Sequence, residues 1–369
     1  MQDVTLYLHI GAGKTGTSSI QNFLAGNSKR LYDSCSCLYP NMAGKNFLAG
    51  GFINHQKFFT TTDERTRTEK IQEAVNYCQK HKKEKLVLSA EALFESIDGP
   101  AFAGKLARIP GLHLKIIVYL RRQDHWLESA WKQWGYKSDK YRDIADYIQK
   151  RDCNWLKRLQ LWEQAAGRAG IIVGCYEKQQ LPQGLIPDFL RLMGIDYTAH
   201  SWIEQRDLLM GFNRDIMEIL FLNKKYCYGE PDVRLQTFFE NYLDESYQKE
   251  SFEAYSFLSP NERISILERN ERSNQIIARE YLGREDSRLF YEPWPDPDEP
   301  WSPYRGLALE TVIPVFSQIL FTMDDRFMED TLLYPKKKAL ETDHNNPGTA
   351  KGRIYSLIKT IQEKYYRGL

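Results

Sequence analysis

The stretch that decides the fold lies near the amino terminus, where residues 9–20 read HIGAGKTGTSSI. It follows residues 4–10, VTLYLHI, a short apolar run that predicts a buried strand. Beyond the glycines, apolar side chains recur at helical spacing from Ile20 onward, which predicts a helix over residues 17–29. The unit is therefore a strand, a tight glycine-containing loop and a helix.

The same alternation continues along the first 200 residues. Short apolar runs predict further strands at residues 86–89, 114–120 and 171–176. Helical patterns separate them, at residues 64–81, 124–137, 154–167 and 184–193. Short buried strands that alternate with helices predict an α/β fold, with a central parallel sheet and helices on both faces.

The strand signal stops near residue 200, and the chain is divided there. We expect an α/β core over residues 1–200, a helical cap that contributes to an acceptor pocket over 201–290, and an irregular and helical extension over 291–369. The cap is predicted from aromatic-rich helical patterns at residues 206–223, 233–249 and 261–282. The extension is predicted from a proline-rich break at 292–300, an apolar segment at 307–321, a polar linker at 341–352 and a last helix at 353–366.

Composition excludes several classes of function. Fifty Lys and Arg nearly balance 49 Asp and Glu in 369 residues, and a net charge of +1 does not favour nucleic-acid binding. The six cysteines form no C-x-x-C pair and no histidine cluster has metal-ligand spacing, so we expect no metal site and a reducing compartment. With no leader-like segment and no long apolar stretch, we expect a cytoplasmic protein without membrane insertion.

The loop of residues 11–18 has the composition of an anion site. Glycines bring backbone N–H groups close to a ligand, and the start of the following helix adds a positive dipole. Lys14 adds a mobile cation, and the hydroxyls of the loop add donors. The first glycine of a G-x-x-x-x-G-K-[ST] loop would fall at Leu8, inside the strand, so the loop lacks one glycine of a kinase or NTPase loop.

A family resemblance enters at this loop. Residues 8–21, LHIGAGKTGTSSIQ, resemble the 5′-phosphosulfate loop of the sulfotransferases that use 3′-phosphoadenosine-5′-phosphosulfate (PAPS), especially the bacterial branch. In that family the fold is P-loop-like, the lysine contacts the bridging oxygen, and hydroxyls and backbone hold the 5′-phosphate. The resemblance implies these roles for Gly13, Lys14, Thr15, Gly16, Thr17 and Ser18.

A second stretch supplies the other half of the expected cofactor site. In residues 116–129, IIVYLRRQDHWLES, a buried strand ends at Arg121 and a helix carries Ser129 eight residues later. Ligands of open α/β sheets lie outside the carboxyl ends of strands, so Arg121 and the first loop can face one crevice. A guanidinium binds phosphate bidentately. The arrangement resembles the family's 3′-phosphate site and implies that Arg121 and Ser129 hold that phosphate; Arg122 is a weaker candidate.

Two residues are candidates for the base that activates the acceptor. Family members use a His or a Glu between the two cofactor motifs, and His55 is the first choice here, with Glu91 second. Sulfate carries less charge than a γ-phosphate, so no metal is required. The acceptor, a small molecule or a saccharide with mild preference for carbohydrate, is not specified. Two rival readings are a P-loop kinase or NTPase and a non-catalytic nucleotide-binding module.

Overall fold

The computed structural model describes most of the chain. The described residues are 2–44, 46–48, 55–203, 212–229, 232–243, 255–303 and 306–331. The predicted linker and the last predicted helix lie outside them.

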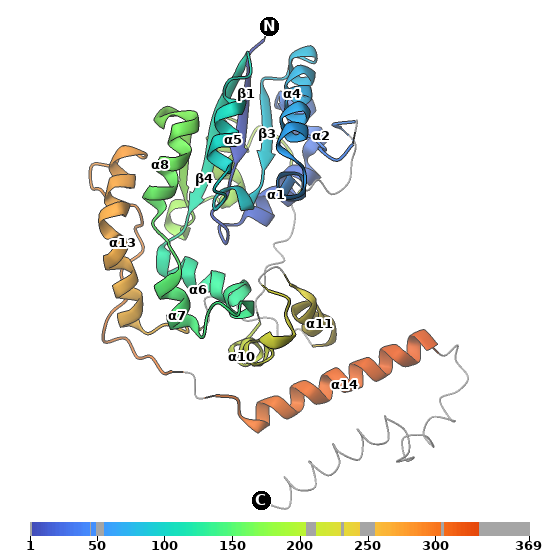
Figure 1. Cartoon of the computed structure of the whole chain (residues 1–369), viewed down its shortest axis with the longest axis vertical. Helices are drawn as coiled ribbons and strands as arrows, with labels where there is room; N and C mark the ends of the chain where they lie inside the picture. The colour runs from blue at the N-terminus through green and yellow to red at the C-terminus, as the bar shows by residue number, and fades with distance from the viewer. Residues whose placement is uncertain are drawn as a thin grey trace, which may run out of the picture. The chain divides into compact units, whose positions relative to one another are not determined.

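A five-stranded parallel sheet forms the centre of the fold (Figure 1). Its order is β2-β3-β1-β4-β5, so β1 lies in the middle with Leu8 in register with Leu88 on one side and Ile116 on the other. This confirms the predicted α/β class. The strands are β1 (Val4–His9), β2 (Cys37–Leu38), β3 (Lys85–Ser89), β4 (Leu112–Leu120) and β5 (Ile171–Cys175).

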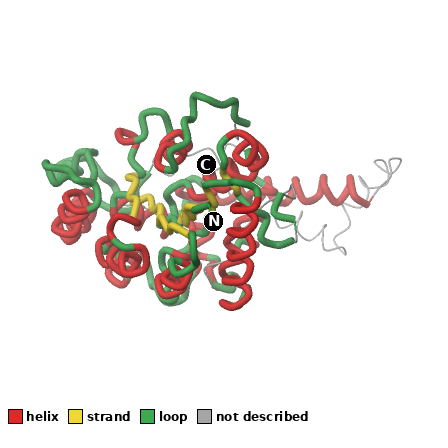
Figure 2. The backbone as a smooth tube through the Cα atoms, turned by 90° about the horizontal axis from the view of Figure 1, so that it is seen from above, coloured by secondary structure: helices red, strands yellow, loops and turns green. Residues whose placement is uncertain are grey.

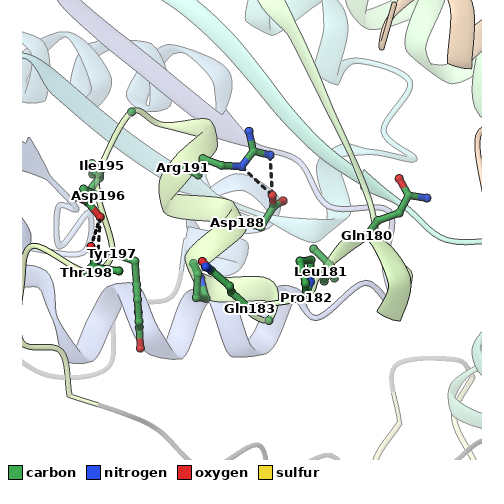
Figure 3. A pocket seen from close by; sticks show the side chains of 13 residues that line it. Gln180, Leu181, Pro182, Gln183, Asp188, Arg191, Ile195, Asp196, Tyr197 and Thr198 are labelled. Carbon is green, nitrogen blue, oxygen red and sulfur yellow. Dashed lines mark hydrogen bonds and ion pairs between the residues drawn. The ribbon is translucent and has the colours of Figure 1, made fainter. Parts of the chain in front are cut away.

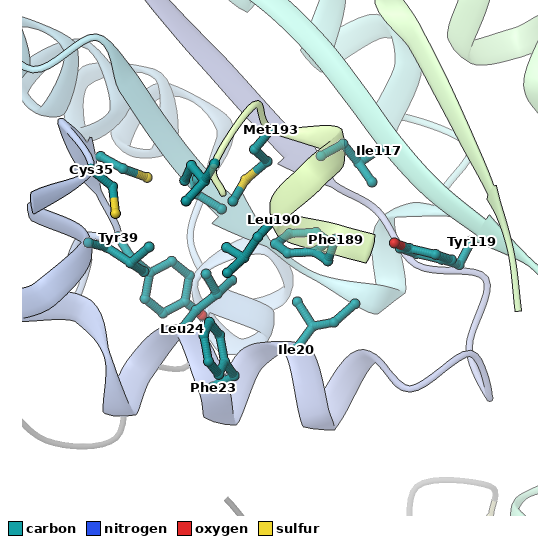
Figure 4. Close-up of a cluster of buried hydrophobic side chains, with 14 residues drawn as sticks. Ile20, Phe23, Leu24, Cys35, Tyr39, Ile117, Tyr119, Phe189, Leu190 and Met193 are labelled. Carbon is teal, nitrogen blue, oxygen red and sulfur yellow. The ribbon is translucent and has the colours of Figure 1, made fainter. Parts of the chain in front are cut away.

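Helices cover both faces of the sheet (Figure 2). On one face α1 (Thr17–Gly26) contacts α9 (Leu185–Leu192), and their apolar side chains bury Ile117 and Tyr119 of β4 in a shared core (Figure 4). On the other, α4 (Glu64–Lys80) contacts β1 and β3, α8 (Trp155–Ala166) contacts β4 and β5, and α5 (Gly99–Leu106) packs on α8. Burial on both faces explains why the strands read as continuous apolar runs.

Two further helices complete the core beside the carboxyl edge of the sheet. Helix α6 (Gln123–Gln133) follows β4, and α13 (Pro260–Glu280) contacts both α6 and α8. The buried amides of Gln123 and Asn274 bond each other reciprocally, at 2.7 and 3.0 Å, and join α6 to α13. Because each amide supplies both a donor and an acceptor, the pair satisfies polar groups that would be costly to bury alone.

The chain divides into two compact units. The first comprises Met1–Gly211, Phe221–Asp232 and Ser251–Arg305, so α13 groups with the sheet, whereas the sequence assigned it to the cap. The second comprises Phe212–Leu220, Val233–Glu250 and Gly306–Leu369, and within it α11 contacts α14. The other helices of the described residues are α2 (Ser28–Ser34), α3 (His55–Thr61), α7 (Ile144–Lys150), α10 (Arg214–Leu222), α11 (Arg234–Tyr242) and α14 (Leu309–Thr331). The described 3₁₀ turns lie at Glu91–Leu93, Gly135–Lys137, Arg168–Gly170, Lys178–Gln180 and Lys224–Tyr226.

Candidate functional site

The loop between β1 and α1 has a left-handed backbone at several positions. The φ angles of Gly11, Gly13 and Gly16 are 49°, 55° and 77°, and Lys14 shares this conformation at 56°. Space is also limiting, because a Cβ built on Gly13 would lie 2.9 Å from the Trp134 ring. Glycine is therefore required at Gly13 on two grounds, conformation and close approach.

Two residues outside the loop hold its carbonyl groups. The indole of Trp126, on α6, donates to the carbonyl oxygens of Ala12 and Gly13 at 2.6 and 3.2 Å. The Arg121 guanidinium donates to the Lys14 carbonyl at 3.2 Å. In a trans peptide the C=O and the following N–H point in opposite directions. The amides after these carbonyls, those of Gly13, Lys14 and Thr15, therefore point away from α6 and Arg121, which suits an anion-binding loop.

Three buried hydroxyls in this region, those of Thr15, Thr17 and Ser129, lack hydrogen-bond partners among the described residues. The side chains of Thr15, in the loop, and Ser129, on α6, are 0% and 3% exposed. Neither hydroxyl has a partner among the described residues. Buried polar groups in proteins are nearly always paired, so an orphaned hydroxyl beside a glycine-rich loop indicates a ligand atom. Thr17 is likewise 3% exposed, at the start of α1, whereas the predicted hydroxyl of Ser18 is exposed.

Charged groups converge where β1, β3 and β4 end. Burial lowers the pKa of Lys14 to about 8; the Arg121 guanidinium acts in the same direction and the Glu91 carboxylate opposes it. Burial raises the pKa of Glu91, against the effect of Lys14, and Glu95 raises it further. These three strand ends therefore bring Lys14 within electrostatic range of both Arg121 and Glu91, although the three residues are far apart in the sequence.

The other base candidate, His55, lies in a closed environment. It is 1% exposed at the start of α3. Its Nε2 bonds the Pro40 carbonyl at 2.7 Å and its Nδ1 accepts the Ser89 backbone N–H at 3.1 Å. Burial lowers the pKa of His55 to about 4. The ring is thus held neutral between two main-chain segments, and both nitrogens are occupied.

Arg121 and Arg122 are adjacent but differ in environment. Arg122 is 4% exposed, and its guanidinium donates to both carboxylate oxygens of Asp124, at 2.8 and 2.9 Å, and pairs with Glu292 at 3.2 Å. These bonds tie the start of α6 to the segment after α13. Arg121, in contrast, lies over the Tyr176 ring at 5.7 Å, and both arginines line a cavity of about 590 Å³. Arg122 therefore supports the structure around that cavity.

Two cavities lie near the groups that converge on the loop. The one beside Arg121 is also lined by Tyr176, Lys178, Leu185 and Glu292. A second, of about 390 Å³, is lined by Gly13, Glu91 and Trp134 among others. Sequence reasoning missed Trp126, Trp134 and Tyr176. Trp126 and Trp134 carried a signal, because both lie in the predicted helix over residues 124–137 that also contains Ser129.

A third cavity is lined by α9 and the segments before and after it, and none of the predicted site residues lines it (Figure 3). Its volume is about 770 Å³, and it shares Leu181 and Gly184 with the cavity beside Arg121. Its charged groups are internally satisfied: Arg191 pairs with Asp188 at 2.6 Å, and Asp196 accepts from Thr198. These charged groups of the cavity therefore already have partners within the protein and give no indication of a ligand.

The comparisons with known proteins give limited likenesses. No protein-family model matches the chain. Over 181 residues the chain is 33% identical to an uncharacterized protein of Archaeoglobus fulgidus; the match covers 48% of each, so the chain spans about half the length of that relative. A crystal structure of a sulfotransferase from Alicyclobacillus acidocaldarius matches 59% of this chain and 91% of its own, with a TM-score of 0.33 and 15% identity.

Two further observations concern classes of site. In the described part of the chain, no three His, Cys, Asp or Glu side chains gather closely enough to hold a metal ion. None of the described helices combines the length and the apolar character needed to cross a membrane.

Proposed function

We propose that this chain is a sulfotransferase that uses PAPS as the sulfuryl donor and transfers the group to a hydroxyl or amine of a small-molecule or saccharide acceptor. The observation that carries the proposal is the contact between Arg121 and the Lys14 carbonyl. It joins the two expected anion sites, the loop after β1 and the end of β4, at one edge of the sheet. A donor with phosphates at both its 5′ and 3′ positions requires two neighbouring sites of this kind.

The residues present fit such a donor. The buried hydroxyls of Thr15 and Ser129 need acceptors, and phosphate oxygens supply them. Amides of the loop and the start of α1 suit the 5′-phosphate, while Arg121 and Ser129 suit the 3′-phosphate. The cavity beside Arg121, with the Tyr176 ring on its wall, has room for a nucleoside.

The proposed chemistry needs one cation and one base from the chain. The acceptor oxygen bonds to sulfur as the bond from sulfur to the 5′-phosphate oxygen breaks, and the electron pair of that bond stays on the phosphate. In this proposal Lys14 neutralises this developing charge. The acceptor proton goes to Glu91, whose raised pKa brings it closer to the neutral range in which a general base is effective.

We favour Glu91 over His55 as the base. Glu91 lines the cavity of about 390 Å³ beside the loop, together with Gly13. His55 is buried with both ring nitrogens bonded to main-chain groups, so it cannot take a proton from an acceptor without breaking one of those bonds. Its role in this proposal is to hold the end of β3, where Ser89 precedes Glu91 by two residues.

Calorimetric titration with 3′-phosphoadenosine-5′-phosphate (PAP) and with ATP tests the proposal. The wild type should bind PAP tightly and ATP weakly. Arg121→Ala should weaken PAP binding about 10- to 100-fold, the range expected for lost charge-assisted hydrogen bonds. The exposed Arg108→Ala is the matched control and should leave the affinity unchanged.

The outcomes separate the proposal from its two rivals. Equal binding of ATP, with no effect of Arg121→Ala, would favour a P-loop kinase or NTPase. Tight PAP binding without any turnover of PAPS would favour a nucleotide-binding module that has no acceptor chemistry. Turnover of PAPS that disappears in Lys14→Ala would support the enzyme.

A further inference from the structure

The cavity next to Glu91 has an aromatic wall in contact with the anion-binding loop. It holds about 390 Å³, within the usual range for small-molecule sites of about 300–1,000 Å³. Trp134 forms one side, and its ring is so close to Gly13 that a Cβ there would lie 2.9 Å away. A ring compound that packs against this indole therefore lies directly beside the loop.

The charges of this cavity are mainly negative. Glu91 and Glu95 line it, and Arg151 is the single cationic side chain among the described lining residues. Arg151 already donates to both carboxylate oxygens of Glu95, which is 43% exposed. The described lining residues thus carry a net formal charge of −1, and Arg151, the cation among them, is committed to a carboxylate.

The remaining polar groups suit hydroxyls. Gln56 lines the cavity, and its amide oxygen accepts the Ala92 backbone N–H at 3.0 Å. Its NH₂ group remains as a donor, beside carboxylate oxygens that act as acceptors. Donors and acceptors around an aromatic face match a ring that has an apolar C–H side and a polar rim.

We propose that this cavity binds the acceptor, and that the acceptor is a hydroxylated ring compound without negative charge, such as a neutral or amino sugar. Its role as acceptor site rests on the proposed function; its charge preference rests on Glu91, Glu95 and Arg151 alone. An anionic ligand would lose its hydration beside two carboxylates and find Arg151, the cation among the described lining residues, already paired, which is unfavourable. Under the proposed function, the anionic donor adds to this repulsion.

A pair of ligands that differ in one charged group tests the inference. Phenyl β-D-glucoside and phenyl β-D-glucuronide have the same ring and differ by a CH₂OH group in place of a carboxylate. Their binding to the full chain is measured by calorimetry, with and without PAP. We expect the glucoside to bind at least about tenfold more tightly than the glucuronide.

A specificity variant shows whether the cavity is responsible. Glu95→Gln removes a carboxylate and releases Arg151, so the preference for the glucoside should shrink to about threefold or less. Glu69→Gln is the matched control, since Glu69 also pairs with an arginine, Arg65, but on the exposed surface of α4. It should leave the preference unchanged.

The results distinguish this inference from the proposed function. Equal or tighter binding of the glucuronide, no binding of either sugar, or an unchanged preference in Glu95→Gln would overturn the inference. None of these results affects the proposed function as long as PAP binds and Arg121→Ala weakens it. Preference for the glucoside in a chain that does not bind PAP would retain the charge inference and reject PAPS as the donor.

Discussion

At the scale of single residues, the orphaned hydroxyls of Thr15 and Ser129 make opposite predictions for stability and binding. Thr15→Val and Ser129→Ala remove a buried polar group that has no protein partner among the described residues. Each should leave the melting temperature unchanged or raise it, because the cost of desolvating the hydroxyl disappears. Each should weaken PAP binding about 3- to 30-fold, because the bound phosphate loses a donor. Loss of stability with unchanged affinity would assign both hydroxyls a purely structural role.

A comparison of activity with stability also distinguishes the two candidate bases. Glu91→Gln should lower kcat by about 10²–10⁴ while PAP affinity changes little, because the carboxylate is needed only when the acceptor loses its proton. His55→Gln should act mainly on stability, since it disturbs bonds to Pro40 and Ser89. Steady-state kinetics and thermal unfolding of both variants check this. A His55→Gln enzyme with normal stability and the larger loss of kcat would reverse the assignment.

Lys14 and Glu91 together predict a bell-shaped pH profile of kcat/KM. Activity needs deprotonated Glu91, so it should fall as the pH drops through the raised pKa of that group. It also needs charged Lys14, whose pKa is about 8, so it should fall again above pH 8. Lys14→Arg keeps its charge to higher pH and should lose the alkaline limb, even at reduced activity. An alkaline limb that persists in Lys14→Arg would show that another group causes it.

At the scale of elements, α6 holds the anion-binding loop through Trp126. Trp126→Phe keeps the apolar packing but removes the bonds to the carbonyls of Ala12 and Gly13. We expect a loss of about 1 kcal/mol in the free energy of unfolding and a PAP affinity about tenfold lower, because the loop is less well ordered before binding. Trp162→Phe, a buried tryptophan of α8, is the control and should leave PAP affinity unchanged. If Trp126→Phe and Trp162→Phe weakened PAP binding equally, the loss of affinity would come from general destabilisation of the fold.

At the scale of the molecule, two buried histidines make stability depend on pH. Burial lowers the pKa of His9 to about 3 and of His55 to about 4, from about 6.5 in an unfolded chain. Below pH 6.5 the unfolded state binds more protons than the folded state. The free energy of unfolding is therefore highest above that pH, as far as these two histidines are concerned, and decreases as the pH falls toward 4. Near pH 5 each histidine should contribute a slope of about 1.4 kcal/mol per pH unit.

Urea unfolding between pH 7 and 5, followed by tryptophan fluorescence, measures this slope. All eight tryptophans lie in the first compact unit, so the signal reports on that unit alone. His55→Gln should reduce the slope by the contribution of one proton. His113→Gln, which replaces an exposed histidine, should not change it. A slope that stays the same in His55→Gln would mean that His55 is not held neutral by burial.

The sequence by itself determined the features that depend on neighbouring residues. The apolar run of β1, the glycines of the loop and the start of α1 are local patterns, and the structure has them in the predicted places. The predicted strands near residues 86–89, 114–120 and 171–176 appear with ends shifted by no more than two residues. The positions of Lys14 and Arg121 at strand ends followed from this, because parallel strands end at one edge of the sheet.

Only the tertiary structure decided which of these groups meet and which are enclosed. The sequence ranked His55 ahead of Glu91 as the candidate base, but burial and two main-chain bonds distinguish His55 from Glu91. The contacts of Trp126 with the loop and of Gln123 with Asn274 join residues more than 100 positions apart. Such contacts leave no periodic signal in the chain. They arise because a folded core fixes distant side chains in one geometry, in which each buried polar group must find its partner.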